Sequence, residues 1–220
     1  MELTEIQANL QQTDYQFRLK AIAALRDFPA ETAIPLLQQH EADPEFLVRT
    51  FVARELGNHR TDSAFATLLE MMLRDNTPNV RAEAANSLSL FGAVSAAHLV
   101  STFLQDDHWL VRRSILGALA DMRAASAIWE VTEVAIAHLE DPPTRETAVR
   151  ALGLLANTPQ QEVAIAKLVE LSQDESWQVR QQVAYALKGF TLPIAQETLA
   201  KLKQDSDHRV IGAVLEEWPK

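Results

Sequence analysis

Residues 106–119 read DDHWLVRRSILGAL, and three other stretches repeat this phrase: DPEFLVRTFVAREL at 43–56, DNTPNVRAEAANSL at 75–88 and DESWQVRQQVAYAL at 174–187. Each phrase begins with Asp, has Arg six residues later, and carries small or aliphatic residues three and six or seven residues after that Arg. Those apolar spacings form one face of a helix. Each phrase therefore predicts a turn that starts at Asp and leads into a helix.

The same arginine position recurs along the chain with a period of about 32 residues, which is typical of a solenoid. The aligned arginines are Arg18, Arg49, Arg81, Arg112, Arg145, Arg180 and Arg209. A second apolar-periodic stretch precedes each turn, such as SAFATLLEMMLRD at 63–75, so each unit is predicted to be a helical hairpin. Near three arginines the Asp stands four rather than six residues before (Asp14, Asp141 and Asp205), which predicts shortened turns there.

The predicted fold is all-α: a right-handed α-solenoid, or superhelix, of about seven helical hairpins in one repeat domain over residues 1–220. First helices are expected on the convex side and second helices on the concave side. The predicted units are 3–28, 30–58, 61–91, 93–122, 124–156, 159–190 and 193–218.

Composition narrows the classes of partner. Twenty Lys and Arg against thirty Asp and Glu give a formal charge of −10, which disfavours nucleic acid. No apolar run approaches the length of a bilayer span, so no membrane insertion is expected. The chain has no Cys and therefore no disulfide framework, and no secretory signal is recognised at its start. These features predict a cytoplasmic protein whose partner is another protein.

The Asp-x5-Arg spacing with its VRxxAxxAL tail resembles HEAT repeats, specifically the short, thirty-residue type named for phycobilisome lyases. The resemblance extends from Leu3 to Trp218. Members of that group attach or isomerise bilin chromophores on antenna proteins, and relatives are implicated in antenna turnover. The resemblance thus implies an antenna subunit as partner, a phycobilin as transferred ligand, and a heterodimer with a related repeat protein.

The repeated Asp and Arg predict a structural ladder of ion pairs and backbone hydrogen bonds between stacked turns, because the planar fork of Arg reaches several acceptors at once. A catalytic site would not be needed in every repeat. The predicted ladder residues are Asp43, Arg49, Asp75, Arg81, Asp106, Arg112, Asp174 and Arg180.

Two other repeat positions are candidates for partner binding. Three residues before the arginine stand the bulky Phe46, Trp109 and Trp177, which either plug the gap between turns or serve as aromatic anchors for a partner. The positions one and five residues after the arginine lie off the apolar face and vary between units. The candidates there are Arg54, Asn86, Arg113, Arg150, Gln181 and Tyr185. The three arginines form either a basic strip suited to an acidic patch or a solvated face with local ion pairs.

No catalytic or metal-binding motif is recognised. His40 and His138 share a repeat position, three residues before the turn, but fall in distant units, so no metal cofactor is expected. The sequence contains no Gly-rich phosphate loop and no Gly-x-Ser-x-Gly motif. The leading hypothesis is a non-enzymatic binding scaffold, an assembly or chaperone-like adaptor without a cofactor. The alternative is a phycobilin lyase or isomerase subunit, or a factor in phycobilisome assembly or turnover.

Overall fold

The structure, a computed structural model, describes residues 1–138 and 141–216, with the side chain of His138 also outside the description. The described residues form helices and connecting turns without a β-strand. The chain forms two compact units, Met1–Met122 and Arg123–Lys220. The all-α solenoid prediction is confirmed, while the grouping of all hairpins into one domain stays a prediction. None of the described helices combines the length and apolar character needed to cross a membrane.

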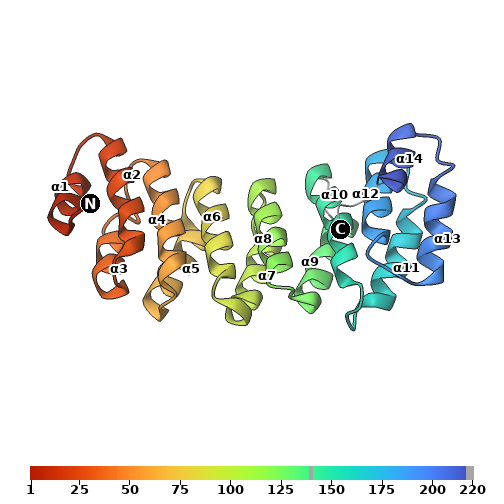
Figure 1. The fold of residues 1–220 in the computed structure, drawn as a ribbon, viewed down its shortest axis with the longest axis horizontal. Helices are drawn as coiled ribbons and strands as arrows, with labels where there is room; N and C mark the ends of the chain where they lie inside the picture. Colours follow the sequence, from red (N-terminus) through yellow and green to blue (C-terminus); the bar gives the residue numbers. More distant parts are fainter. Residues whose placement is uncertain (139–140, 217–220) are drawn as a thin grey trace. The chain divides into compact units, whose positions relative to one another are not determined.

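The first unit contains four helical hairpins (Figure 1). Their first helices are α1 (Leu3–Leu10), α3 (Ala30–Gln38), α5 (Asp62–Arg74) and α7 (Ala96–Gln105); their second helices are α2 (Tyr15–Ala24), α4 (Phe46–His59), α6 (Pro78–Ser89) and α8 (Trp109–Asp121). Short 3₁₀ turns, η1 (Leu25–Asp27) and η2 (Gly92–Ser95), lead from α2 to α3 and from α6 to α7. The second helices pack in sequence, α2 on α4, α4 on α6 and α6 on α8, and so form one layer.

The second unit contains three hairpins of the same kind. They are α9 (Ala125–His138) with α10 (Pro142–Ala151), α11 (Gln161–Leu171) with α12 (Trp177–Leu187), and α13 (Pro193–Leu202) with α14 (His208–Leu215). The 3₁₀ turn η3 (Leu152–Leu155) follows α10. Here too the second helices form a layer, with α10 against α12 and α12 against α14. The predicted end of the last hairpin at residue 218 lies outside the described residues.

The apolar positions that follow each arginine form the core. Val52 and Leu56 of α4 are fully buried, as are their counterparts Ile115 and Leu119 of α8. Burial of such side chains from water is the main source of stability, about 25 cal/mol for each Å² of apolar surface. The repeated sequence phrase therefore supplies the contacts between successive second helices.

Two glycines lie so close to a neighbouring second helix that neither has room for a side chain. In the first unit, a Cβ added at Gly57 of α4 would stand 2.8 Å from the Cβ of Ser87 of α6. In the second unit, a Cβ at Gly153 would stand 2.9 Å from the backbone of Ala186 in α12. Both distances are shorter than atoms tolerate, so each glycine is required by a neighbouring helix and not by its own backbone conformation.

Candidate functional site

The turn arginines and aspartates form a ladder whose rungs each join one hairpin to the next. Arg49 donates from Nε and Nη2 to the two carboxylate oxygens of Asp75, at 2.6 and 3.0 Å. Its Nη1 donates to the backbone carbonyl of Asp43, the aspartate of its own turn, at 2.8 Å. Both side chains of this ion pair are largely buried. One guanidinium therefore holds two successive turns at once, through a bidentate, charge-assisted contact.

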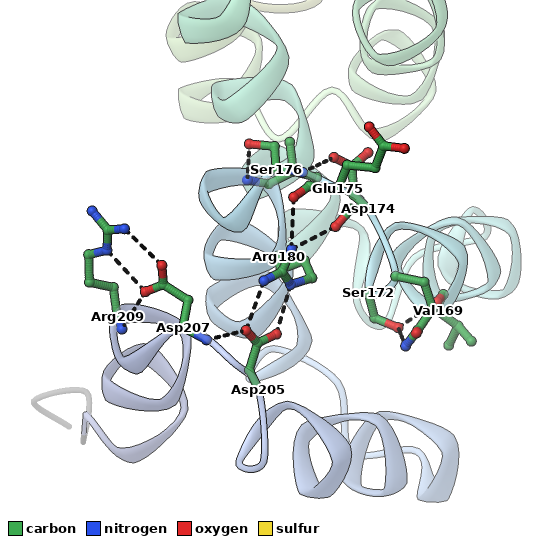
Figure 2. Close-up of polar contacts among 11 residues, drawn as sticks. Val169, Ser172, Asp174, Glu175, Ser176, Arg180, Asp205, Asp207 and Arg209 are labelled. Carbon is green, nitrogen blue, oxygen red and sulfur yellow. Dashed lines mark hydrogen bonds and ion pairs between the residues drawn. The ribbon is translucent and has the colours of Figure 1, made fainter.

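The same geometry recurs in both units. Each of the five arginines that form a rung pairs with the aspartate of the following hairpin, whereas its own turn aspartate offers at most a backbone carbonyl. The other rungs are Arg18–Asp43 at 2.8 Å, Arg81–Asp106 at 2.6 Å, Arg145–Asp174 at 2.6 Å and Arg180–Asp205 at 2.7 Å. Figure 2 shows the last of these rungs, with Arg180 also donating to the backbone carbonyls of Asp174 and Glu175.

Each rung aspartate also organises its own turn. One carboxylate oxygen of Asp75 accepts the amide of Thr77 at 2.8 Å, and Asp174 and Asp205 accept the amides of Ser176 and Asp207 in the same way. This contact closes a local turn and leads the chain into the next helix. The aspartate thus has two roles: its carboxylate closes the local turn and pairs with the arginine of the preceding hairpin.

Three of the rungs lower the pKa of their aspartate. Burial alone raises the pKa of the Asp43 carboxyl, but hydrogen bonds from Arg18 and the Glu45 amide outweigh burial and lower it. The pKa of Asp174 is lowered by the same balance, with Arg145 and the Ser176 amide as donors. For Asp205 the hydrogen bond from Arg180 is the largest influence, and its pKa is also lowered. These carboxylates are therefore held ionised, as structural ion pairs require.

Two details of the predicted alignment are wrong. Asp14 and Asp141 are helix N-caps that accept the amides of Gln16 and Thr144, at the position that Ser176 holds before α12. Asp205 is a regular rung aspartate, and Arg209 is not a ladder arginine, because it forms its ion pair with Asp207 at 2.7 Å. Ile211 holds the ladder position in the last hairpin.

Arg112 departs from the ladder. The structure records no ion pair for Arg112 among the residues it describes, and its buried Nε has no hydrogen-bond partner there. Asp106, which stands in the same turn, pairs with Arg81 instead. The position six residues before Arg145, where other hairpins carry the rung aspartate, is Leu139. This residue lies outside the described residues, but its side chain has no carboxylate to offer.

The candidate aromatic anchors differ in their environment. Each is the first residue of a second helix. Phe46 is 37% exposed and Trp109 is 42% exposed, with the Trp109 ring stacked on His108. Trp177 is instead covered by the guanidinium of Arg209, which lies 3.3 Å from the ring centroid. In the described part of the chain, Phe46 and Trp109 thus remain accessible to a partner while Trp177 is engaged within its own unit.

Most of the variable positions after the ladder arginine make contacts of their own. Arg54 pairs with Glu83 of α6 at 2.8 Å and lies over the ring of Phe51. Asn86 and Arg113 are exposed. The expected basic strip is therefore reduced in the first unit, because the Arg54 charge is balanced by Glu83.

In the second unit these positions are tied together. The guanidinium of Arg150 lies 4.7 Å from the centroid of the Tyr185 ring, and the Tyr185 hydroxyl donates to Glu216 at 2.7 Å. That hydrogen bond is the largest cause of the raised pKa of Tyr185. Gln181 donates to the backbone carbonyl of Arg209 at 3.3 Å. Three predicted binding residues thus serve contacts between successive second helices.

One polar cluster was not predicted. Glu55 of α4 is 1% exposed and accepts two hydrogen bonds from Arg26, at 3.0 and 3.1 Å, and one from Asn58 at 2.8 Å. A signal was present in the sequence, because Glu55 stands six residues after Arg49, where the other five hairpins with an arginine at the ladder position carry Ala or Ser. A carboxylate at a small, buried position requires partners, and Arg26 of the preceding hairpin supplies them.

Hollows lie beside two of the rungs. One of about 520 Å³ beside Arg49 and Asp75 is lined by Glu41, Glu70, Met71 and Arg74 among others, and burial together with the charge of Glu70 raises the pKa of Glu41. One of about 360 Å³ beside Arg180 and Asp205 is lined by Ser172, Gln173, Lys201, Gln204 and Ser206 among others. The linings differ in charge, so the hollows follow from the stacking of turns and do not form one recurring ligand site.

Among the described side chains, no three His, Asp or Glu residues gather in a manner that could hold a metal ion. His40 instead lies against a rung, with its Nδ1 3.4 Å from a carboxylate oxygen of Asp43. The side chain of His138 lies outside the described residues. His40 is therefore placed to support the turn of its own hairpin.

Known structures share this architecture. The complex of CpcE and CpcF of phycocyanin lyase from Nostoc is similar with a TM-score of 0.55 and 19% identity, over 97% of this chain and 94% of that chain. The Escherichia coli protein YibA is similar with a TM-score of 0.63 and 18% identity, over 97% of this chain and 80% of that chain. At these identities the similarity concerns the fold alone.

A comparison with curated proteins finds no match. The sequence profile of HEAT repeats, in contrast, matches residues 4–89, 65–139 and 132–217. These overlapping matches extend over almost the whole chain and agree with the hairpin architecture and its ladder. The chain belongs to the family of HEAT-repeat proteins.

Proposed function

We propose that the chain is a non-enzymatic scaffold that binds a partner protein on the layer of second helices. The observation that carries this proposal is the contrast between repeat positions. Core and ladder positions recur from hairpin to hairpin, whereas the surface positions of α4, α6 and α8 carry different side chains, such as the half-buried Thr50 and the exposed Asn86 and Arg113. Repeat proteins recognise their partners through such variable surface positions on a uniform frame.

The accessible groups in the first unit suit a protein surface. Trp109 and Phe46 offer exposed aromatic rings, which are favoured anchors at protein interfaces. Arg113 adds an exposed positive charge on the same helix as Trp109, suited to an acidic patch. The proposal places the protein in the cytoplasm, acting as an assembly factor or adaptor.

The test is capture of the partner from a lysate of the native host on the immobilised full-length chain, with mass spectrometry of the eluate. Arg113→Ser and Trp109→Ala are expected to reduce capture of the partner at least tenfold. Arg74→Ser is the matched control, because Arg74 is an exposed arginine on a first helix, α5. Circular dichroism verifies that all variants remain folded. If all variants capture the partner equally, the layer of second helices is not the binding surface.

A second candidate function is a subunit that handles a bilin-bearing antenna protein. The fold similarity to the CpcE–CpcF complex of phycocyanin lyase favours it, because that assembly pairs two proteins. In this case the chain would act with a related repeat protein and hold a phycobilin as transferred ligand. The discriminating measurement is the visible spectrum of the same eluate and of the purified chain mixed with phycocyanobilin. A shifted bilin absorbance supports this function, and an unchanged spectrum with a colourless partner supports the plain scaffold.

A further inference from the structure

Two arginines of the first unit are held by carboxylates that are much less exposed than they are. Arg26, in η1, donates from Nε and Nη2 to the two carboxylate oxygens of Glu55, and Arg54 donates from Nε to Glu83 at 2.8 Å. The arginine side chains are 55% and 44% exposed, whereas those of Glu55 and Glu83 are 2% and 20% exposed. Each ion pair is therefore polarised, with its positive charge toward solvent and its negative charge inside.

The two arginines are neighbours in space. Glu55, which holds Arg26, directly follows Arg54 in α4. The amide of Asn58 donates to the Glu55 carboxylate at 2.8 Å and to the backbone carbonyl of Arg54 at 3.5 Å. The hydrogen bond with Glu83 raises the pKa of Arg54, and the positive charge of Arg26 opposes this rise, so the two guanidinium groups lie within electrostatic range. Arg26 and Arg54 are called the arginine pair below.

Each guanidinium keeps donors that its own carboxylate does not use. Among the described residues, Nη1 and Nη2 of Arg54 and Nη1 of Arg26 have no recorded hydrogen bond. Nη1 and Nη2 form the end of the planar fork of Arg54, which matches the two oxygens of a carboxylate. The ring of Phe51 lies 5.0 Å from this guanidinium and Glu83 holds its Nε edge, so the orientation of the fork is restricted before a ligand binds.

An ordinary surface ion pair in the same unit lacks this arrangement. Arg74 and Glu70 are four residues apart on α5, and both side chains are largely exposed. Two exposed, flexible side chains are only weakly held in one geometry. The arginine pair differs because the buried Glu55 cannot turn to water and instead holds the guanidinium of Arg26 in one place.

The stacking of hairpins does not require the ion pair of Arg26 and Glu55. Between the third and fourth hairpins, the equivalent positions carry the small residues Ser89 and Ala118. Burial of a carboxylate with its partner has a desolvation penalty that two small residues do not incur. This penalty indicates a use beyond joining two hairpins, and the group that the ion pair presents to solvent is the outer edge of Arg26.

We propose that the arginine pair binds an acidic segment of the partner protein, with one carboxylate on the fork of Arg54 and a second at Nη1 of Arg26. The inference rests on the proposed function, since it specifies the partner as a protein with two closely spaced Asp or Glu residues. Such a segment is favoured over a single small anion because the two guanidinium groups come from different hairpins. The formal charge of −10 disfavours a nucleic acid as the source of the anions.

The probe is the peptide acetyl-EDEDED-amide, titrated into the ¹⁵N-labelled full-length chain, with the neutral peptide acetyl-QNQNQN-amide as its control. The Nε–H resonances of Arg26 and Arg54 are followed, because both groups are hydrogen-bonded to a carboxylate. We expect the two resonances to shift together with a Kd of about 1 mM, the range for a few contacts at an exposed site. The neutral peptide should leave both resonances in place.

Two variants each remove one half of the arginine pair without leaving a fully buried charge. Arg54→Asn introduces the residue type that Asn86 supplies at the same position of α6. Arg26→Ser combined with Glu55→Ala introduces the types that stand at residues 89 and 118. Each variant should weaken binding of the acidic peptide at least about tenfold, the loss of one charge-assisted hydrogen bond or more. Circular dichroism verifies that both remain folded.

Three controls make the result decisive. Arg74→Gln, on the exposed arginine of α5, should leave the Kd unchanged. Asp27 is an exposed carboxylate next to Arg26, so Asp27→Asn removes an opposing charge and should tighten binding about twofold. Sodium acetate at the same concentration of carboxylate should not reproduce the shifts, and equal shifts with acetate would overturn the pattern of two linked carboxylates.

Failure of the inference is distinguishable from failure of the scaffold function. If both arginine variants capture the partner from lysate as well as the unaltered chain, the inference is overturned and the scaffold stands, whether or not they bind the peptide. Peptide binding that is unchanged in both variants overturns the inference as well. If the peptide binds as expected but no protein is captured from the host lysate, the scaffold function is overturned, and with it the assignment of the acidic segment to a partner protein.

Discussion

The first turns of α8 and α12 begin with the same residues, Trp followed three positions later by Arg, yet only the α12 pair is engaged. Asp205 and Arg209 complete the turn of α12. For α8 the ladder position six residues before Arg145 is Leu139, and Arg112 has no recorded partner among the described residues. The comparison teaches that the role of a repeated residue is decided by the next hairpin as much as by its own.

Acid should weaken the rungs of Asp43, Asp174 and Asp205 together, and this is expected to be the largest effect. The folded-state pKa values of Asp43, Asp174 and Asp205 are lowered from 3.8. Groups with lowered folded pKa values contribute stability that is fully present above the unfolded value and is lost as pH falls through the folded value. Urea unfolding followed by circular dichroism should therefore show stability that falls steeply below pH 3.8. Asp205→Asn should flatten this fall, and an unchanged pH profile in that variant would contradict the assignment.

Arg81→Ala and Arg112→Ala give the sharpest single-residue comparison, because both arginines lie in the first unit. Arg81 removal leaves Asp106 buried without its ion pair, which should lower the free energy of unfolding by about 3 kcal/mol. Arg112 removal breaks no ion pair recorded among the described residues and should lower it by less than about 1 kcal/mol. The measurement is urea unfolding of the two variants. Equal losses would mean that Arg112 is held by contacts equivalent to a rung.

Arg209→Ala should have the smallest effect on the structure, because it removes only the cation that covers Trp177. The Arg180–Asp205 rung of the same turn stays in place. The uncovered Trp177 is expected to show a changed indole N–H resonance and faster quenching of its fluorescence by acrylamide. The Trp109 resonance should not move, and Arg209→Lys should retain most of the covering. An unchanged Trp177 signal in the alanine variant would mean that the cation does not cover the ring in solution.

Much of the fold was predictable because period and core contacts are local properties of the sequence. The spacing of Val52 and Leu56 after Arg49 predicts one apolar face, and both residues are buried. The recurrence of Asp and Arg likewise indicated a ladder between stacked turns. Residue spacing alone could not predict which aspartate each arginine pairs with, because Asp43 and Asp75 both lie at regular spacings from Arg49.

The candidate site was less predictable because exposure depends on neighbours in space. Arg54 was expected on a basic strip but is balanced by Glu83 of the next second helix. Trp177 and Trp109 look alike in sequence, and the cation that covers Trp177 comes from a hairpin whose arginine was placed in the wrong register. Glu55 was overlooked because its partner Arg26 is in the preceding hairpin. In each case a cross-hairpin contact decides the outcome.

The close approach at Gly57 and Ser87 has a consequence for how such a protein changes over evolution. A single methyl group at residue 57 would act as a spacer between α4 and α6 and would widen the separation between the side chains they display. The distance between Arg54 and Glu83 therefore depends on residue 57. This residue packs between the helices and would not itself contact a bound partner. Descendants of this chain could alter their selectivity by exchanging glycine and alanine inside the stack while every exposed residue stayed the same.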